Sequence, residues 1–162
     1  MPARRVAIAL GSNLGNRTAA ITYAAERLES LVSDISLSQL VETEPEGPEG
    51  NEARDQPLYL NAVLVGETAL SARELLDAML TIELDYGRER PYQGAPRTLD
   101  LDLVLLGDEI VDEPGLQVPH PRFRQRFFVL GPMAEVASDL RDPVTGMSVG
   151  QLLKALLSDD SR

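Results

Sequence analysis

The sequence predicts an α+β fold, a ferredoxin-like antiparallel sheet in the order βαββαβ with helices on one face, followed by a helical carboxy-terminal part. Three observations carry this prediction. Four segments alternate apolar and polar residues or run as short aliphatic stretches, as strands do. Two of the segments between them, and two more at the end, repeat apolar residues at helical spacing. A length of 162 residues suits one domain, which we expect to span residues 1–162.

The first part of the chain supplies three strands and the first helix. In chain order we expect a strand over 5–10, a turn over 11–16, a helix over 16–32, and strands over 34–43 and 58–67. The helix is indicated by an apolar stripe that contains Ile21, Ala24 and Leu28. Residues 44–57 combine prolines, glycines and acids, which predicts a long loop of the kind that closes over ligands.

A second helix, an acidic strand and a helical end complete the pattern. Ser71-Ala72-Arg73-Glu74 has the form of a capping box, so a helix begins there and reaches about Tyr86, with Gly87 as its stop. The other expected elements are an irregular loop over 88–98, a strand over 99–106, a short strand over 109–111, and helices over 127–137 and 148–157.

The strand over 99–106 carries two acids on one face. Side chains alternate along a strand, so Asp100 and Asp102 point one way and the leucines around them point into a core. Two such carboxylates can converge on a hard divalent cation, and without a cation they repel each other. Arg97 adds a fork of donors shaped for phosphate. The pattern indicates a magnesium–polyphosphate site, although it also occurs on the solvated face of an edge strand.

The overall charge argues against several classes of partner. The formal net charge is −11, whereas nucleic acids and membrane surfaces bind basic faces, so we expect neither partner. The absence of cysteine excludes disulfides and zinc–thiolate sites. No stretch approaches the length of a membrane span, and no signal-like segment precedes the first strand, so we expect a cytoplasmic protein.

The basic residues are almost all arginines, and many of them gather near the acid pair. Only Lys154 is a lysine, a preference that genome composition can explain. The arginines that fall between residues 88 and 126 are Arg88, Arg90, Arg97, Arg122, Arg124 and Arg126. A basic cluster within an acidic protein draws a small anionic ligand to one cleft.

Several residues have both a structural and a functional interpretation. The segment from Gly11 to Gly15 either cradles a phosphate or is a tight turn in which Asn13 or Ser12 caps the next helix. Tyr59 and Asn61 share a strand face, where they either bind a flat heterocycle or mark the margin of the core.

The same holds for residues outside these segments. His120, the only histidine, lies between two prolines and is either structural or a phosphate ligand. Glu83 either faces solvent on its helix or accepts from a ribose hydroxyl. The phenylalanines that we expect in the core, unless one of them forms a second stacking wall, are Phe123, Phe127 and Phe128.

Five groups of residues follow one another between residues 5 and 145. They are Ala9-Leu10-Gly11-Ser12-Asn13-Leu14-Gly15, Tyr59-Leu60-Asn61-Ala62, Ile82-Glu83 with Gly87-Arg88, Pro96-Arg97-Thr98-Leu99-Asp100-Leu101-Asp102, and Val118-Pro119-His120 with Arg126 and Phe128. In order and in spacing, this set resembles the 6-hydroxymethyl-7,8-dihydropterin pyrophosphokinases of folate biosynthesis.

The resemblance implies an enzyme, a 2-amino-4-hydroxy-6-hydroxymethyldihydropteridine diphosphokinase. Its reaction transfers pyrophosphate from ATP to the hydroxymethyl group of the pterin and gives AMP and the pterin diphosphate. The resemblance further implies ATP as co-substrate and two Mg²⁺ ions on Asp100 and Asp102, with Arg88 and Arg97 as catalytic arginines that grip the phosphates. The residues implied in nucleotide binding are Glu83, Leu103, His120 and Arg126, and those implied in pterin binding are Thr43, Tyr59, Asn61 and Phe128.

Some positions depart from the family pattern. Many members carry a tryptophan in the loop before the acid pair, where this chain has none and Tyr92 is the available aromatic residue. Leu80 replaces a frequent glutamine, Pro121 replaces a common aromatic residue, and the loop over 44–57 is long. These departures concern loop closure and adenine contacts and leave the acid pair unchanged.

Two other functions are compatible with parts of the pattern. A metal-dependent phosphohydrolase, or a nucleotidyl- or glycosyltransferase, would also use Asp-x-Asp but would give Tyr59 and Asn61 no role. A ferredoxin-like binding or regulatory module would show no magnesium dependence and would leave the arginine cluster unexplained. With ATP and the pterin as its expected partners, the enzyme is expected to be a monomer.

Overall fold

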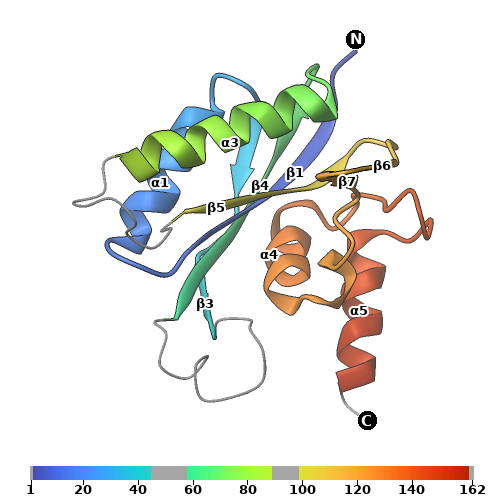
Figure 1. The fold of residues 1–162 in the computed structure, drawn as a ribbon. Helices are drawn as coiled ribbons and strands as arrows, with labels where there is room; N and C mark the ends of the chain where they lie inside the picture. The colour runs from blue at the N-terminus through green and yellow to red at the C-terminus, as the bar shows by residue number, and fades with distance from the viewer. Residues whose placement is uncertain (1, 45–57, 89–98, 161–162) are drawn as a thin grey trace.

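The computed structural model describes residues 2–44, 58–88 and 99–160. Figure 1 shows their arrangement. In chain order the elements are β1 (Arg4–Ser12), α1 (Arg17–Leu28), β2 (Ser33–Leu37), β3 (Val41–Thr43), β4 (Tyr59–Thr68), α3 (Ala72–Arg88), β5 (Asp100–Leu106), β6 (Val111–Glu113), β7 (Leu116–Val118), the short 3₁₀ helix η1 (Phe123–Gln125), α4 (Phe127–Ala137) and α5 (Val149–Asp160). Within these residues no helix is long and apolar enough to cross a membrane.

The main sheet is antiparallel, as predicted. Its strands lie in the order β2–β4–β1–β5, and β3 also pairs with β4. The long central pair joins Arg4 to Thr68 at one end and Ser12 to Leu60 at the other. Strand β5, which carries the acid pair, therefore lies at an edge of the sheet, and β1 is the one strand of the sheet that it pairs with. The α+β prediction is confirmed.

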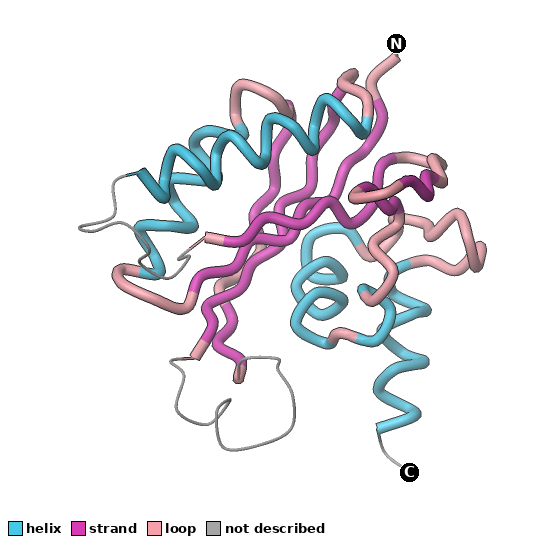
Figure 2. Tube along the Cα trace, viewed as in Figure 1, coloured by secondary structure: helices cyan, strands magenta, loops and turns pink. Residues whose placement is uncertain are grey.

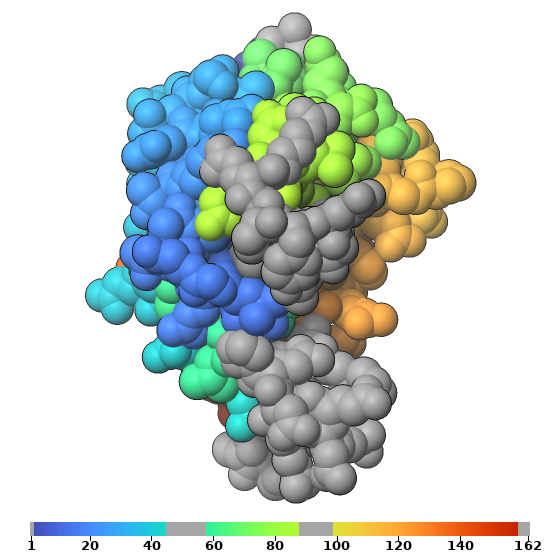
Figure 3. All heavy atoms as spheres, turned by 60° about the vertical axis from the view of Figure 1, so that its left-hand side comes forward, coloured from blue at the N-terminus to red at the C-terminus, as the bar shows by residue number. Residues whose placement is uncertain are grey.

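Helices cover both faces of this sheet. Figures 1 and 2 show α1 and α3 on one face and α4 with α5 on the other, and Figure 3 shows α1 beside α3 on the surface. The first layer buries side chains such as Ile8, Leu10 and Leu64. The second buries Val63 and Leu105 with residues of α4 and α5. The crossover helices share one face as expected, and the carboxy-terminal helices pack on the opposite face.

Strand alternation places the acid pair on the α4 face of the sheet. Leu101 and Leu103 of β5 are buried under α1 and α3, whereas Val104 lies in the core under α4. Asp100 and Asp102 have the same parity as Val104 and therefore point to that second face. The predicted orientation of the two acids relative to the leucines is confirmed.

Several local boundaries differ from those expected. Strand β1 extends through Gly11 and Ser12, so the turn begins only at Asn13. Neither Asn13 nor Ser12 caps α1. The cap is Asn16, whose side-chain oxygen accepts a 3.0 Å hydrogen bond from the Ala19 amide. The predicted capping box at α3 is confirmed, because Ser71 and Glu74 exchange side-chain-to-backbone hydrogen bonds of 2.9 and 3.1 Å.

Two expected strands are organised differently. The segment 34–43 is two strands, because Ser38 leaves the ladder and bonds to Val63 through its amide and through its hydroxyl, each at 2.9 Å. In place of a short strand over 109–111, the chain forms the two-stranded hairpin β6–β7 around Pro114 and Gly115. The loops expected over 44–57 and 88–98 lie, beyond Glu44 and Arg88 themselves, outside the described residues.

Candidate active site

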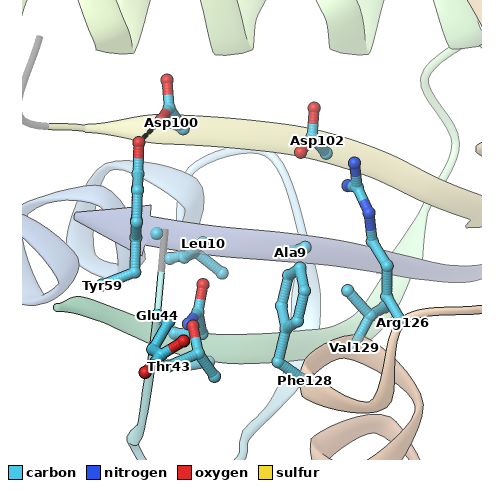
Figure 4. Close-up of a pocket in the computed structure, with 13 residues that line it drawn as sticks. Ala9, Leu10, Thr43, Glu44, Tyr59, Asp100, Asp102, Arg126, Phe128 and Val129 are labelled. Atoms are coloured by element: carbon cyan, nitrogen blue, oxygen red, sulfur yellow. Dashed lines mark hydrogen bonds between the residues drawn. The ribbon is translucent and has the colours of Figure 1, made fainter. Parts of the chain in front are cut away.

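A pocket of about 210 Å³ opens where α4 leaves its face of the sheet uncovered. Strand β4 shows why it forms there. Val63 is buried beneath α4, while Asn61 and Tyr59 continue the same face beyond the start of that helix. The lining comprises Ala9, Leu10, Gly11, Thr43, Glu44, Tyr59, Asn61, Ala62, Asp100, Asp102, Arg126, Phe128 and Val129. Figure 4 shows most of these side chains directed into the pocket.

Both acids of β5 line this pocket. Asp100 is half-buried and Asp102 is exposed to the cavity. The Tyr59 hydroxyl donates a hydrogen bond of 3.3 Å to Asp100 Oδ2, drawn as a dashed line in Figure 4. Burial raises the pKa of the Tyr59 phenol, and the Asp100 carboxylate raises it further. The phenol therefore stays protonated at neutral pH and remains a donor to Asp100.

Two aromatic rings bound the pocket on opposite sides. Figure 4 shows Tyr59 rising from β4 on one side and Phe128 rising from the first turn of α4 on the other. The Arg126 guanidinium lies 5.6 Å from the Phe128 ring centroid and covers the outer end of that wall. Of the other phenylalanines, Phe123 is buried in the core as expected, whereas Phe127 is 50% exposed and is not a core residue. Aromatic walls of this kind offer stacking surfaces to a flat ring.

Amide and hydroxyl groups form the inner end of the pocket. Asn61 is buried, and its Nδ2 donates to Thr43 Oγ1 at 2.7 Å and to the Val41 carbonyl at 3.5 Å. These bonds fix the orientation of the side-chain amide, because its nitrogen donates to two residues of strand β3. Glu44, the next residue after β3, also lines the pocket and was not among the expected site residues. Its position as the first residue of the long predicted loop was the available signal.

Gly11 keeps the floor of the pocket open. A Cβ at this position would lie 3.2 Å from Asn61 Oδ1 and 3.6 Å from Tyr59 Cδ1. The first distance is tighter than ordinary contact, so an added methyl group must displace the amide that lines the pocket. The glycine therefore has a packing role in the site and lies in a strand, where neither of its two expected roles, the phosphate cradle and the tight turn, applies.

We expect Gly11→Ala to weaken binding of a flat heterocyclic ligand about tenfold, or about 1.4 kcal/mol. Fluorescence titration with the ligand checks this. Gly131→Ala is the matched control, because its Cβ would meet only Phe127, at an ordinary 3.5 Å. Equal affinities in the Gly11→Ala protein and the wild type would show that the space beside Gly11 does not determine how tightly the ligand binds.

A second cavity, of about 600 Å³, lies beside the first and shares Asp102 with it. It is lined by Leu103, His120, Leu76 and the β6–β7 hairpin, including Asp112 and Gln117. The His120 ring accepts a 3.1 Å hydrogen bond from the Arg122 amide through Nδ1, and its own amide donates to the Val104 carbonyl. The Arg122 amide thus holds the ring, and the Val104 carbonyl holds the His120 backbone, at the edge of this cavity.

The expected nucleotide-binding residues are distributed over both cavities. Leu103 and His120 line the second and Arg126 lines the first. Glu83 lines neither, and its carboxylate accepts a hydrogen bond of 2.7 Å from the Leu101 amide. Of the two expected catalytic arginines, Arg88 is the last residue of α3, without a described side chain, and Arg97 lies outside the described residues.

One member of the arginine cluster has a structural partner. Arg124 forms hydrogen bonds of 2.6 and 2.9 Å with the carboxylate of Asp142, which is fully buried between α4 and α5. Asp142 also accepts from the Thr145 hydroxyl at 2.7 Å. Although burial opposes its ionisation, the bonds from Arg124, Thr145 and the Val144 amide hold the pKa of Asp142 below its usual value. Arg124 therefore does not contribute to a ligand-binding cluster.

The acid pair suits a cation that brings ligands of its own. Among residues 2–44, 58–88 and 99–160, no three histidine, cysteine or acidic side chains converge as a protein cage for a metal ion. Mg²⁺ does not need such a cage, since it commonly binds one or two carboxylates together with waters and substrate phosphates. Asp100 and Asp102, directed into one pocket, therefore fit Mg²⁺ delivered with a polyphosphate.

Known proteins resemble this chain in sequence and in fold. Residues 7–138 match the family model described as 7,8-dihydro-6-hydroxymethylpterin-pyrophosphokinase (HPPK). The 2-amino-4-hydroxy-6-hydroxymethyldihydropteridine pyrophosphokinase of Pseudomonas aeruginosa is 42% identical over 154 residues, which are 94% of this chain and 91% of that protein. The protein of the same name from Bacillus subtilis is 37% identical over 146 residues, which are 89% of this chain and 84% of that one.

A solved structure shares the fold at low sequence identity. The crystal structure of wild-type Plasmodium falciparum HPPK-DHPS matches 97% of this chain with a TM-score of 0.73 and 13% identity. This chain spans 45% of the length of that one. The likeness supports the antiparallel sheet with helices on both faces, independently of the sequence motifs.

Proposed function

The chain belongs to the 7,8-dihydro-6-hydroxymethylpterin-pyrophosphokinase family, and from this premise we propose how its pocket carries out the family reaction. The enzyme transfers a pyrophosphoryl group from ATP to the hydroxymethyl group of 6-hydroxymethyl-7,8-dihydropterin, a step of folate biosynthesis. The hydroxymethyl oxygen bonds to the β-phosphorus, the bond from that phosphorus to the oxygen it shares with the α-phosphorus breaks, and AMP leaves with this oxygen. The hydroxymethyl proton is lost in the same step.

The pterin binds between Tyr59 and Phe128. The two rings bound the pocket on opposite sides, and stacking on both faces of the flat bicyclic system excludes water from it. The pterin edge carries amide-like donors and acceptors that complement Asn61 Oδ1, Thr43 and the neighbouring backbone. In this pose the hydroxymethyl group points towards β5, where Asp100 and Asp102 lie.

Asp100 and Asp102 hold the magnesium ions, for which two are expected from the resemblance. Bound there, Mg²⁺ would neutralise negative charge on the triphosphate. The protein's own contribution is positioning, because phosphoryl transfer requires little covalent chemistry from side chains. Tyr59 also donates the 3.3 Å hydrogen bond to Asp100. The same side chain therefore stacks on the pterin and positions a carboxylate of the site that binds the ATP phosphates.

The nucleotide occupies the second cavity, with its phosphates directed towards the shared residue Asp102. Leu103 and His120 contact the nucleoside and phosphates from within that cavity, and Arg126 approaches the phosphates from the first cavity. Arg88 and Arg97 grip the transferred group, and together with the bound cations they offset its developing charge. These assignments to Arg88 and Arg97 rest on the resemblance alone.

One observation favours this function over the alternatives. The acid pair lies in the same pocket as Tyr59 and Asn61, and Tyr59 hydrogen-bonds directly to Asp100. A phosphohydrolase or another Asp-x-Asp transferase would not need the aromatic walls of Tyr59 and Phe128 at its metal site. A regulatory module would not need paired acids beside these walls. The expectation of a cytoplasmic monomer, built as one domain over residues 1–162, stays a prediction.

The product distinguishes these functions. Incubation with ATP, Mg²⁺ and 6-hydroxymethyl-7,8-dihydropterin is expected to give AMP and pterin diphosphate in equal amounts, resolved by ion-exchange chromatography. Removing Mg²⁺ with a chelator is expected to stop AMP formation, and restoring the ion to recover it. ADP or free phosphate as the product would favour the other enzyme class. Pterin binding without any magnesium-dependent turnover would favour the module.

A further inference from the structure

Glu83 reaches from α3 to the strand that carries the acid pair. One of its carboxylate oxygens accepts a hydrogen bond of 2.7 Å from the backbone amide of Leu101, a residue 18 positions away in the sequence. Leu101 lies between Asp100 and Asp102 on β5. The bond therefore joins the central peptide of the Asp-x-Asp segment to a helix of the opposite layer.

The amide that Glu83 binds lies on the free edge of the sheet. Strand β5 pairs with β1 on one side only, and Leu101 stands opposite Leu10 in that pairing. Backbone amides alternate in direction along a strand, so an amide bonded to α3 does not also bond to β1. Without Glu83, this amide loses a charge-assisted acceptor, and such bonds are among the stronger ones in proteins.

The bond fixes the residue that lies between the two acids. The Leu101 side chain is buried under α1 and α3, and its amide is held by Glu83, so the residue is fixed at two points. Its neighbours Asp100 and Asp102 project from the opposite face into the pocket. A change in the orientation of the Leu101 amide would redirect both side chains, because the Asp100 Cα belongs to that peptide unit and the Asp102 Cα to the next one.

We propose that Glu83 is a positioning residue that acts through the Leu101 amide to keep Asp100 and Asp102 aimed at a shared divalent cation. This inference rests on the proposed function for the identity of the cation and extends it to a residue outside both cavities. It differs from a direct nucleotide contact, which would change affinity for the nucleotide without changing the Leu101 amide or the magnesium requirement.

Three variants test the proposal. Glu83→Ala removes the acceptor, and Glu83→Gln keeps an acceptor oxygen but not the charge. Asp77→Ala removes an exposed acid of the same helix that lies away from β5 and is the matched control. For each protein, hydrogen exchange of the Leu101 amide is followed by ¹⁵N NMR. The Mg²⁺ concentration needed for half-maximal binding of α,β-methylene-ATP is measured by calorimetry, and wild-type AMP formation is measured separately.

The two readouts must change together if the proposal holds. In Glu83→Ala, Leu101 exchange is expected to rise at least tenfold and the magnesium requirement at least fivefold, with smaller shifts in Glu83→Gln and none in Asp77→Ala. Unchanged Leu101 exchange, or an unchanged magnesium requirement despite faster exchange, would overturn it. If Glu83→Ala does not fold, the same two readouts in Glu83→Gln decide. Failure of the wild type to form AMP would instead overturn the proposed function, while the exchange readout would still report on Glu83.

Discussion

Asp102→Asn is expected to lower turnover on the order of 10³-fold while leaving the fold and pterin binding intact. The substitution keeps the size of the side chain and removes the charge that both cavities share. Asp102 is exposed, so the free energy of unfolding should change by no more than about 0.5 kcal/mol. Tyr59, Asn61 and Phe128 are untouched, so pterin affinity should stay within about twofold of wild type.

Steady-state AMP formation, pterin fluorescence titration and thermal unfolding together check this expectation. Asp108→Asn is the matched control, because Asp108 is an exposed aspartate in the turn that follows the same strand and lines neither cavity. It should behave as wild type in all three measurements. Near-wild-type turnover in Asp102→Asn would remove the basis for the cation site, and an equal loss in the control would point to a general charge effect.

Asp142→Ala is expected to destabilise the protein by about 3 kcal/mol, which lowers the unfolding midpoint by roughly 6–12 °C. The substitution leaves the Arg124 guanidinium without its carboxylate and removes the acceptor for Val144 and Thr145. Removing one partner of a buried ion pair leaves the other charge and its hydrogen-bonding groups without partners. The loss of folding free energy is therefore much larger than the net stabilisation that the intact pair provides. Thermal and urea unfolding measure the loss.

The matched control is Asp139→Ala, three residues earlier. Asp139 also pairs with an arginine, Arg5, at 2.8 Å, but its side chain is 75% exposed. An exposed pair of this kind contributes little, so the change should stay within about 0.5 kcal/mol. Equal destabilisation by the two substitutions would contradict the role assigned to burial.

The Asp142 contribution should also depend on pH with a definite sign. The folded-state pKa of Asp142 lies below its unfolded value, because Arg124, Thr145 and Val144 outweigh the effect of burial. The stabilisation is therefore fully present above the unfolded pKa of about 3.9 and is lost as the pH falls through the folded pKa. The difference in stability between wild type and Asp142→Ala should thus be constant near neutrality and shrink in acid.

Local periodicity accounts for what could be predicted about the site. Alternation along single strands sufficed to pair Asp100 with Asp102 and Tyr59 with Asn61, because the direction of a side chain in a strand depends only on parity. The capping box at Ser71 was likewise readable, since both partners lie within one turn. That the two pairs share one pocket was a hypothesis, and the antiparallel order β4–β1–β5 accounts for it.

Features that depend on contacts distant in sequence were not predictable in the same way. The pocket exists because α4 covers Val63 but does not extend over Asn61. This arrangement follows from how α4 packs on Val63 and its neighbours. Ser38 ends β2 by bonding to Val63, a partner 25 residues away.

The β6–β7 hairpin had a usable local signal, since Pro114-Gly115 between two short apolar segments is a turn pattern, and Gly115 has a positive φ of 77°.

The central claim is that the acid pair holds its cation next to a pterin bound between Tyr59 and Phe128. Paramagnetic relaxation tests this most directly, with Mn²⁺ in place of Mg²⁺, α,β-methylene-ATP as the nucleotide, and the proton signals of bound 6-hydroxymethylpterin as the readout. The hydroxymethyl protons are expected to broaden most, and Asp102→Asn is expected to abolish the broadening. Tight pterin binding without any effect of Mn²⁺ on these protons would contradict the account.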